Sequence, residues 1–386
     1  MRLLAAALVG LALAGCGGGG APPAGRQLPA SATGLRFLAA GDDAGFERAF
    51  EPRPLGFPAD HGSHPSFRTE WWYFTGNLHA AGGRHFGFEL TFFRLALAPE
   101  EPDSRSAWAA RHAWMAHFAI TDTARGRFFA AERFARQALG LAGAEPDPFR
   151  VWVERWSATQ AAAPGGAFAV RLQAAEDDAA LDLELVAAKP PVAQGEDGWD
   201  AKGPEPGNAS YYYSLTRLAA DGSLAVGGER FDVAGLAWMD REWSTSSLSA
   251  GVEGWDWLAL QLSDGRDLML YQLRQTDGSP SPFSSGSVVG ADGAARTLDA
   301  EDFTLRPLAY WTSESTGVRY PVSWRVEVPS ERLALVVEPH LRNQELDLSV
   351  RYWEGAVRVT GRSGDRDVTG NGYLELAGYR RAARQR

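Results

Sequence analysis

Strand signals dominate the chain, and most of these segments alternate apolar and polar residues, which is the pattern of β-strands with one buried face. Nine such segments are bounded by Gly, Asp, Asn or Pro: 87–95, 150–156, 169–174, 180–187, 256–262, 267–273, 323–329, 333–339 and 354–361. Beyond the N-terminus, no stretch reaches 18 consecutive apolar residues. We therefore expect an all-β chain of antiparallel strands with short turns. The main exception is 129–141, where a short amphipathic helix is predicted and a strand and loop are the alternative.

Three pairs of segments recur in the same order along the chain: 71–94 with 255–274, 169–191 with 323–339, and 233–240 with 368–375. Each of the first two pairs has the pattern of two strands around a turn. The third pair shares the frame V-x-G-x-x-[WY]-x-[DE], so that Asp240 and Glu375 occupy equivalent positions. Three pairs in one order indicate a duplicated β unit.

The length of 386 residues is sufficient for two domains. A sheet with many strands leaves unpaired edges unless it closes or pairs with a second sheet. We therefore predict two tandem lipocalin-like antiparallel β-barrels, an N-terminal domain at 35–243 and a C-terminal domain at 244–386. A barrel of around eight strands can enclose one small ligand.

The N-terminus has the features of a lipoprotein leader. A predicted signal peptide covers 1–15, and Leu13-Ala14-Gly15-Cys16 resembles a bacterial lipobox. Cys16 is the only cysteine in the chain, which excludes an internal disulfide. Residues 16–34 are rich in Gly, Pro and Ala, as in a flexible tether. We expect acylated Cys16 to anchor the protein in a bacterial cell envelope and, by analogy, in the outer membrane facing the periplasm.

Charge and motifs exclude several function classes. The chain has 38 Lys and Arg against 48 Asp and Glu, a net charge of −10, and no basic stripe, so nucleic acid is not an expected partner. Phosphate-cradling glycine motifs and the Gly-x-Ser-x-Gly turn of serine hydrolases are absent from the sequence. His112 and His117 are five residues apart, a poor match to a metal pair. We therefore predict no cofactor and no metal.

A longer motif carries a family resemblance. The string His64-Pro65-Ser66-Phe67-Arg68-Thr69-Glu70-Trp71-Trp72-Tyr73-Phe74-Thr75-Gly76-Asn77-Leu78, together with Gly203-Pro204, 209–214 and 240–244, resembles the AttH-like family of secreted bacterial proteins. The resemblance extends from about residue 50 to 380 and implies two lipocalin-like domains. The family is similar to carotenoid 1,2-hydratases, in a superfamily that also includes cyclisation catalysts and proteins without an established activity. A common link of AttH-like proteins with lipoprotein-type ABC transporters implies a periplasmic accessory role.

Aromatic residues are the most conspicuous candidates for a ligand pocket, since the chain contains 14 Trp, 10 Tyr and 19 Phe. The same rings also suit an ordinary core. Adjacent strand residues face opposite sides, so Trp71 and Trp72 cannot both point into one barrel. The predicted ligand-binding residues are Trp71, Tyr73, Tyr211, Tyr213, Trp238, Trp243, Trp255 and Trp257.

Asp240 is the candidate catalytic residue. Aromatic neighbours would desolvate its carboxyl group and raise its pKa, and the resemblance to the hydratases implies that it donates a proton to a double bond. The alternative is an ion pair with Arg241 or a structural carboxylate. A cavity of several hundred Å³ at Asp240 without an arginine partner would favour catalysis. Glu375 occupies the equivalent frame, which favours a fold-stabilising role for both. A binding or acid-base role for His64 with Glu70 is a further alternative.

Three functions remain open at this stage. The first is a membrane-anchored periplasmic lipoprotein that binds a hydrophobic small molecule or lipid as the accessory of an ABC permease. The second is a hydratase-type enzyme that adds water to an unsaturated apolar substrate, or isomerises it, with Asp240 as the acid. The third is a structural protein that docks a transporter through its barrel faces.

Overall fold

The computed structural model describes residues 43–245 and 248–381, so the predicted signal peptide (1–15), Cys16 and the whole predicted tether (16–34) lie outside the described residues. The first sheet contains β1 (Thr69–Ala80), β2 (His85–Ala96), β3 (His112–Asp122), β4 (Arg127–Arg136), β5 (Ala142–Pro146), β6 (Phe149–Val153), β7 (Trp156–Gln160), β8 (Ala169–Glu176), β9 (Ala179–Ala187), β10 (Val192–Ala193), β11 (Trp199–Ala201), β12 (Ala209–Val226) and β13 (Glu229–Ser244). The second contains β14 (Val252–Leu262), β15 (Asp267–Gln275), β16 (Ser285–Val289), β17 (Ala295–Asp299), β18 (Thr304–Thr312), β19 (Arg319–Val328), β20 (Leu333–Pro339), β21 (Glu345–Asp347), β22 (Arg351–Ser363) and β23 (Arg366–Ala377).

The helices of the described residues are short 3-10 turns: η1 (Ala59–His61), η2 (Ala81–Gly83), η3 (Thr123–Arg125), η4 (Pro164–Gly166) and η5 (Pro329–Glu331). In residues 43–245 and 248–381, none of the helices has the length and apolar character needed to span a bilayer. The prediction of an all-β chain is confirmed.

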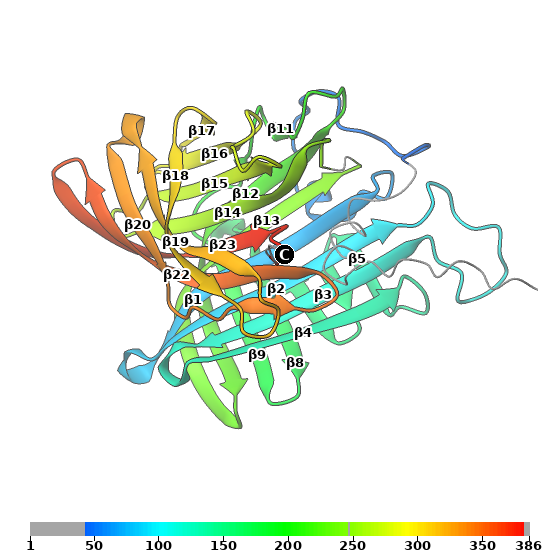
Figure 1. Cartoon of the computed structure of the whole chain (residues 1–386). Helices are drawn as coiled ribbons and strands as arrows, with labels where there is room; N and C mark the ends of the chain where they lie inside the picture. Colours follow the sequence, from blue (N-terminus) through cyan, green and yellow to red (C-terminus); the bar gives the residue numbers. More distant parts are fainter. Residues whose placement is uncertain (1–42, 246–247, 382–386) are drawn as a thin grey trace, which may run out of the picture.

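The two sheets repeat one strand order. The first runs β4-β3-β2-β1-β13-β12-β9-β8-β7-β6-β5 and forms a nearly closed barrel, and the second runs β17-β16-β15-β14-β23-β22-β20-β19-β18 and forms a half-barrel (Figure 1). When β1 is aligned with β14, the orders match in both directions, and the first sheet continues further through β6 and β5. The register agrees, since Tyr73 pairs with Asp240 in β1·β13 and Trp257 pairs with Glu375 in β14·β23. The sequence repeat thus corresponds to a repeated lipocalin-type β unit.

The equivalent hairpins both turn at glycine. Gly82 and Gly83 connect β1 to β2 with φ angles of 77° and 80°, and Gly265 connects β14 to β15 with a φ angle of 87°. Glycine adopts these left-handed angles without the penalty that other residues incur.

The helix predicted within 129–141 is wrong, and the alternative strand is observed. Residues Arg127–Arg136 form β4, which pairs with β3 along its whole length. Phe129, Ala131 and Ala135 all pack on the first core, a spacing in multiples of two that a strand satisfies and a helix does not. Pairing with β3 therefore determines the secondary structure of a segment whose local sequence pattern was ambiguous.

Each sheet encloses its own apolar core. Trp72 and Phe74 of β1 are fully buried in the first core, and Leu258 and Leu260 of β14 are fully buried in the second. Large apolar side chains thus line the interior of each sheet. A third buried cluster lies between the sheets and combines the outward faces of β1, β12 and β13 with those of β14, β15, β22 and β23.

Candidate active site

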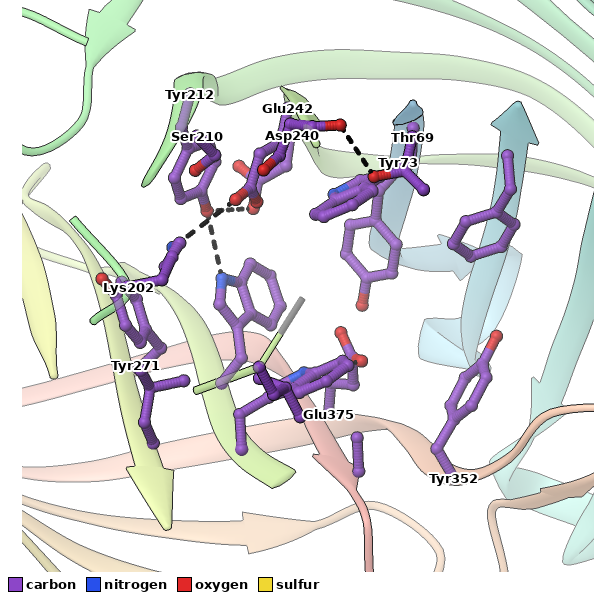
Figure 2. A pocket seen from close by; sticks show the side chains of 18 of the residues that line it. Thr69, Tyr73, Lys202, Ser210, Tyr212, Asp240, Glu242, Tyr271, Tyr352 and Glu375 are labelled. Atoms are coloured by element: carbon purple, nitrogen blue, oxygen red, sulfur yellow. Dashed lines mark hydrogen bonds and ion pairs between the residues drawn. The ribbon is translucent and has the colours of Figure 1, made fainter. Parts of the chain in front are cut away.

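A cavity of about 190 Å³ lies between the two sheets (Figure 2). Both sheets supply its walls: Thr69, Trp71, Tyr73, Phe93, Lys202, Asn208, Ser210, Tyr212, Asp240, Glu242, Ser244, Leu248, Trp255, Trp257, Tyr271, Leu273, Val350, Tyr352, Glu354, Glu375 and Ala377. Its volume is smaller than the several hundred Å³ that we expected of a catalytic cavity. Trp71, Phe93, Leu248 and Trp255 are only half-buried, so the cavity reaches solvent past these apolar side chains.

Strand β13 presents its side chains alternately to the cavity and to the opposite side. Asp240 and Glu242 line the cavity, whereas Arg241 forms an ion pair with Glu70 behind the strand. Successive residues of a strand point to opposite faces, so Asp240 and Arg241 cannot meet. The alternative in which Arg241 neutralises Asp240 is therefore wrong for a geometric reason.

Asp240 is a buried acid held by three neutral donors. The Tyr212 hydroxyl, the Ser214 hydroxyl and Trp238 Nε1 donate hydrogen bonds to its carboxyl oxygens, the last two over 2.6 Å. Burial raises the pKa of Asp240 to about 7, against the effect of these hydrogen bonds, which favour the ionised form. Among the described residues, no Lys or Arg forms an ion pair with Asp240. Its carboxyl group can therefore carry a proton near neutral pH.

The second half of the repeat contributes two more acids to the same cavity. Glu375, the equivalent of Asp240, accepts a hydrogen bond of 2.8 Å from Trp255 Nε1. Glu354 accepts one of 2.9 Å from the Tyr73 hydroxyl. Burial raises the pKa of Glu375 to about 8 and that of Glu354 well above its usual range. The two copies of the frame thus meet in one site.

A charged group closes another part of the cavity wall. Lys202 Nζ forms an ion pair with Asp200, lies 3.5 Å from Glu242 Oε1, and sits 4.0 Å from the centre of the Tyr271 ring. Burial raises the pKa of Glu242, and the charge of Lys202 opposes this effect. This corner is polar, whereas the walls near Trp71 and Trp255 are apolar.

The structure brings together only part of the predicted aromatic set. Trp71, Tyr73, Trp255 and Trp257 line the cavity. Trp238 lies beside it on the same face of β13 and contacts Asp240 through its indole N–H.

The remaining predicted rings, Tyr211, Tyr213 and Trp243, belong to a separate cluster behind β12 and β13 with Ala49 and Phe67. They do not line this cavity, because they occupy strand positions of the opposite parity. Tyr212, between Tyr211 and Tyr213, is the residue that faces the cavity and donates a hydrogen bond to Asp240. Ser214 of β12 pairs with Asp240, so the two side chains share one face of the sheet. Tyr212 lies two positions before Ser214 and therefore points to that same face.

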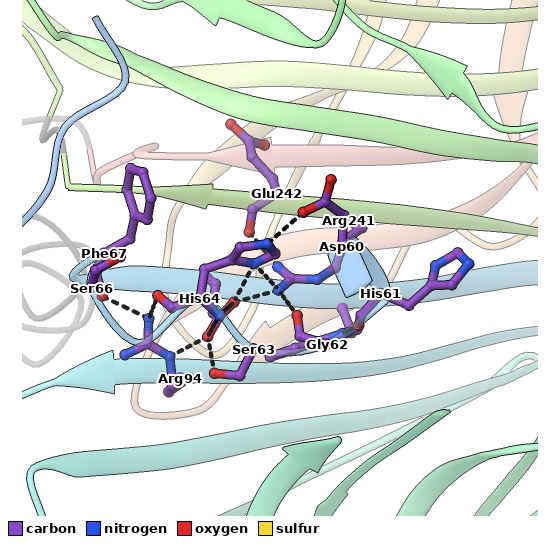
Figure 3. Close-up of polar contacts among 12 residues, drawn as sticks. Asp60, His61, Gly62, Ser63, His64, Ser66, Phe67, Arg94, Arg241 and Glu242 are labelled. Atoms are coloured by element: carbon purple, nitrogen blue, oxygen red, sulfur yellow. Dashed lines mark hydrogen bonds and ion pairs between the residues drawn. The ribbon is translucent and has the colours of Figure 1, made fainter. Parts of the chain in front are cut away.

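His64 and Glu70 belong to a buried ionic cluster behind β13, of which Figure 3 labels His64, Arg94 and Arg241. Glu70 bridges Arg94 and Arg241, and all three side chains are fully buried. His64 Nε2 lies 2.9 Å from Asp60, and the His64 ring stacks on Trp243 with ring centres 3.8 Å apart. This cluster does not line the cavity, so we assign it a structural role.

The two histidines of β3 are also separated. His117 Nδ1 contacts the Tyr352 hydroxyl of the second sheet, whereas His112 Nδ1 lies 2.6 Å from Gln137. Within 43–245 and 248–381, no group of three or more His, Cys, Asp or Glu side chains is arranged to hold a metal ion.

Comparison with known proteins now assigns the family. The model of the AttH-like family matches residues 48–379. The chain belongs to the AttH-like family. A crystal structure bearing the AttH name, from Nitrosomonas europaea, is 33% identical to this AttH-like protein with a TM-score of 0.76, and the match covers 86% of this chain and 100% of that chain. The predicted family and lipocalin-type fold are confirmed.

Two further relatives of this AttH-like protein carry enzyme names. Kievitone hydratase from Nectria haematococca has a TM-score of 0.62 at 15% identity, over 88% of this chain and 99% of that chain, which shows a common fold. Dehydratase asqC from Emericella nidulans is 25% identical over 217 residues, which are 54% of this chain and 56% of that protein. This chain thus spans little more than half of that relative's length.

Proposed function

We propose that this AttH-like protein is an enzyme of the hydratase or dehydratase type, which adds water to a carbon–carbon double bond of an apolar substrate or removes it. The observation that carries the proposal is Asp240, a carboxyl group without a cationic partner at a cavity walled by Trp and Tyr rings. An acid with a pKa near the working pH is partly protonated and well suited to donate its proton.

In the hydration direction, Asp240 transfers its proton to one carbon of the double bond, and the positive charge develops on the other carbon. The electron-rich faces of Trp255 and Trp257, which line the cavity, stabilise such a cation. Water then forms a bond to the cationic carbon and loses a proton, which yields the alcohol. Dehydration follows the same steps in reverse.

The cavity also indicates how much of the substrate is enclosed. A volume of about 190 Å³ accommodates a small group, and the half-buried apolar rim formed by Trp71, Phe93 and Leu248 extends outward from it. We infer that one end of a longer apolar molecule enters the cavity while the rest lies along this rim. The names of the relatives, a hydratase and a dehydratase, support a reaction of this class.

The test is oxygen-18 incorporation from labelled water into two probes, kievitone and a polyene with a terminal isoprenoid double bond. Asp240→Asn removes the proton but keeps the shape, and we expect it to reduce hydration at least ~100-fold. The control is Asp232→Asn, at an exposed position of the same strand, which should match the wild type. Retained hydration in Asp240→Asn, or none of either probe in the wild type, would contradict the proposal.

A carrier of a hydrophobic molecule would use the same apolar walls without chemical change. In the same assay, such a carrier would retain intact probe equally in the wild type and in Asp240→Asn. The anchor at acylated Cys16 in the cell envelope and the association with an ABC permease stay predictions from the sequence, since Cys16 lies outside the described residues.

A further inference from the structure

Glu354 and Glu375 form a pair of carboxyl groups on the cavity wall supplied by the second sheet. They are direct cross-strand partners in β22·β23. Such partners share one face of a sheet, with Cβ atoms about 5 Å apart. Both side chains line the cavity, and Figure 2 shows Glu375 entering it from the side opposite Asp240.

The groups packed around this pair are neutral donors or other acids. Tyr73 and Trp255 donate hydrogen bonds to Glu354 and Glu375, and the phenols of Tyr352 and Tyr373 lie nearby. Buried Glu89 of β2 adds a further carboxyl group, which accepts a hydrogen bond of 2.8 Å from Thr91.

No Lys, Arg or His of the described chain forms an ion pair with Glu354 or Glu375. Two carboxylates so close together in a buried place cannot both ionise, because like charges repel strongly there. Burial and then this repulsion hold the pKa of Glu354 well above its usual range. The pair therefore titrates as a unit, and it holds one proton between its two groups once Glu375 ionises, near pH 8.

The first half of the repeat carries no second carboxyl group at the equivalent position. In the first sheet, the cross-strand partner of Asp240 is Ser214, whose hydroxyl donates to Asp240 over 2.6 Å. The equivalent of Ser214 in the second sheet is Glu354. A buried acid beside another acid disfavours folding, whereas a hydroxyl satisfies its neighbour. A fold-stabilising role thus does not explain why this half carries two carboxyl groups.

Side chains that cross the cavity connect the wall that carries Asp240 with the wall that carries Glu354 and Glu375. Tyr73 is the β1 partner of Asp240, yet its hydroxyl donates to Glu354 of the other sheet. Trp257 is the β14 partner of Glu375, yet its Nε1 donates over 3.2 Å to the hydroxyl of Tyr212, which binds Asp240. Asp240 is therefore linked through Tyr212 to the second sheet, and Glu354 is linked through Tyr73 to the first sheet.

We propose that Glu354 and Glu375 act together as the general base that accepts the proton of the attacking water, and as the general acid for the departing water in the reverse reaction. This inference rests on the proposed function, in which Asp240 protonates carbon. In hydration, Asp240 gives up its proton and becomes a carboxylate. Water forms the carbon–oxygen bond and passes one proton to the pair, which then holds two. The extra proton returns to Asp240 through cavity water, and all three groups regain their starting state.

The first experiment separates the two proton transfers. Probes that the wild type hydrates are incubated in D₂O, and deuterium in the recovered alkene reports protonation of carbon. Asp240→Asn should lose both deuterium uptake and hydration. Glu354→Gln and Glu375→Gln should lower hydration ~100-fold or more. Deuterium uptake should stay within a few-fold of the wild-type value, because the cation can still return a proton to Asp240 and re-form the alkene. The control is Glu314→Gln, at an exposed residue.

Unchanged hydration in both glutamine variants, or loss of deuterium uptake in step with hydration, would overturn the role of the pair while leaving that of Asp240 intact. A wild type that hydrates no probe would overturn both catalytic roles.

The second experiment needs no substrate. In the full chain with ¹³C-labelled glutamate carboxyl groups, NMR titration should show Glu375 ionising near pH 8 and Glu354 keeping its proton to higher pH, and either glutamine variant should lower the pKa of the remaining partner. Circular dichroism matching the wild type confirms that each variant folds. Independent ionisation of Glu354 and Glu375, with no response of one to replacement of the other, would overturn the shared proton.

Discussion

Asp240 and Arg241 are neighbours in the chain, yet their side chains have opposite surroundings. The Asp240 carboxyl group meets three neutral donors beside an open cavity, whereas the Arg241 guanidinium is fully buried against Glu70. Without a cationic partner, Asp240 can keep its proton near neutral pH, whereas Arg241 is a charged group held in a buried ion pair. A single step along the strand therefore separates the proposed chemistry from the scaffold.

At this scale we predict the effect of Tyr212→Phe on the pH dependence of hydration. Activity requires protonated Asp240, so it should fall as pH rises through the pKa of about 7. The Tyr212 hydroxyl stabilises the ionised carboxylate, and its removal should move this alkaline limb upward by about one pH unit, the equivalent of one charge-assisted hydrogen bond. Profiles of kcat/KM against pH measure the shift, and exposed Tyr310→Phe is the control. A limb that stays in place or moves downward would contradict the assignment.

Among the elements, β13 is the strand that joins the site to its support. One face carries Asp240 and Glu242 into the cavity. On the other face, Arg241 meets Glu70 of β1, which also binds Arg94 of β2. This ionic contact crosses three neighbouring strands and fixes the strand that carries the proposed acid.

We therefore expect Glu70→Gln to lower the free energy of unfolding by roughly 3–5 kcal/mol, since it leaves two buried guanidinium groups without their charge partner. Urea unfolding measures the loss. Asp182→Asn breaks an exposed pair with Arg171 and should cost under about 1 kcal/mol. Equal effects of the two substitutions would show that burial of the Glu70 cluster does not matter.

At the scale of the whole molecule, the site exists only because two sheets pack together. Besides the apolar cluster between them, a buried ion group joins the halves. Asp267 of β15 lies 2.7 Å from Lys189 Nζ and 2.6 Å from Arg217 Nη2, both of which belong to the first half. Asn77 likewise donates to the Gly372 carbonyl over 3.0 Å. These contacts predict that the halves unfold as one unit.

Scanning calorimetry should accordingly show a single transition for the wild type. Asp267→Asn removes the negative charge between two cations and should destabilise the protein by about 2–5 kcal/mol. Asp264→Asn, which affects a partly exposed ion pair within the second half, should change little. Two separate transitions in the wild type would mean that the halves are thermodynamically independent.

The sequence supported the strands, the repeat and the family, and it identified Asp240 and four of the aromatic residues that line the cavity. It failed where the side-chain direction was needed. We assigned Tyr211, Tyr213 and Trp243 to the pocket and passed over Tyr212. A run of aromatic residues does not reveal whether its odd or its even positions face the second sheet. The 129–141 segment failed for a related reason, since only pairing with β3 decides its state.

Alternation, the spacing of turns and the recurrence of one frame are local properties, and they alone determine that the chain folds into two copies of an antiparallel unit. Where those units touch is a different matter. Asp240 and Glu375 are 135 positions apart in the sequence, and whether they line one cavity depends on the packing of two outer sheet surfaces. That packing follows from the summed shape and burial of many side chains, which no single segment encodes, so only the tertiary structure decided that the acids of both halves share a site.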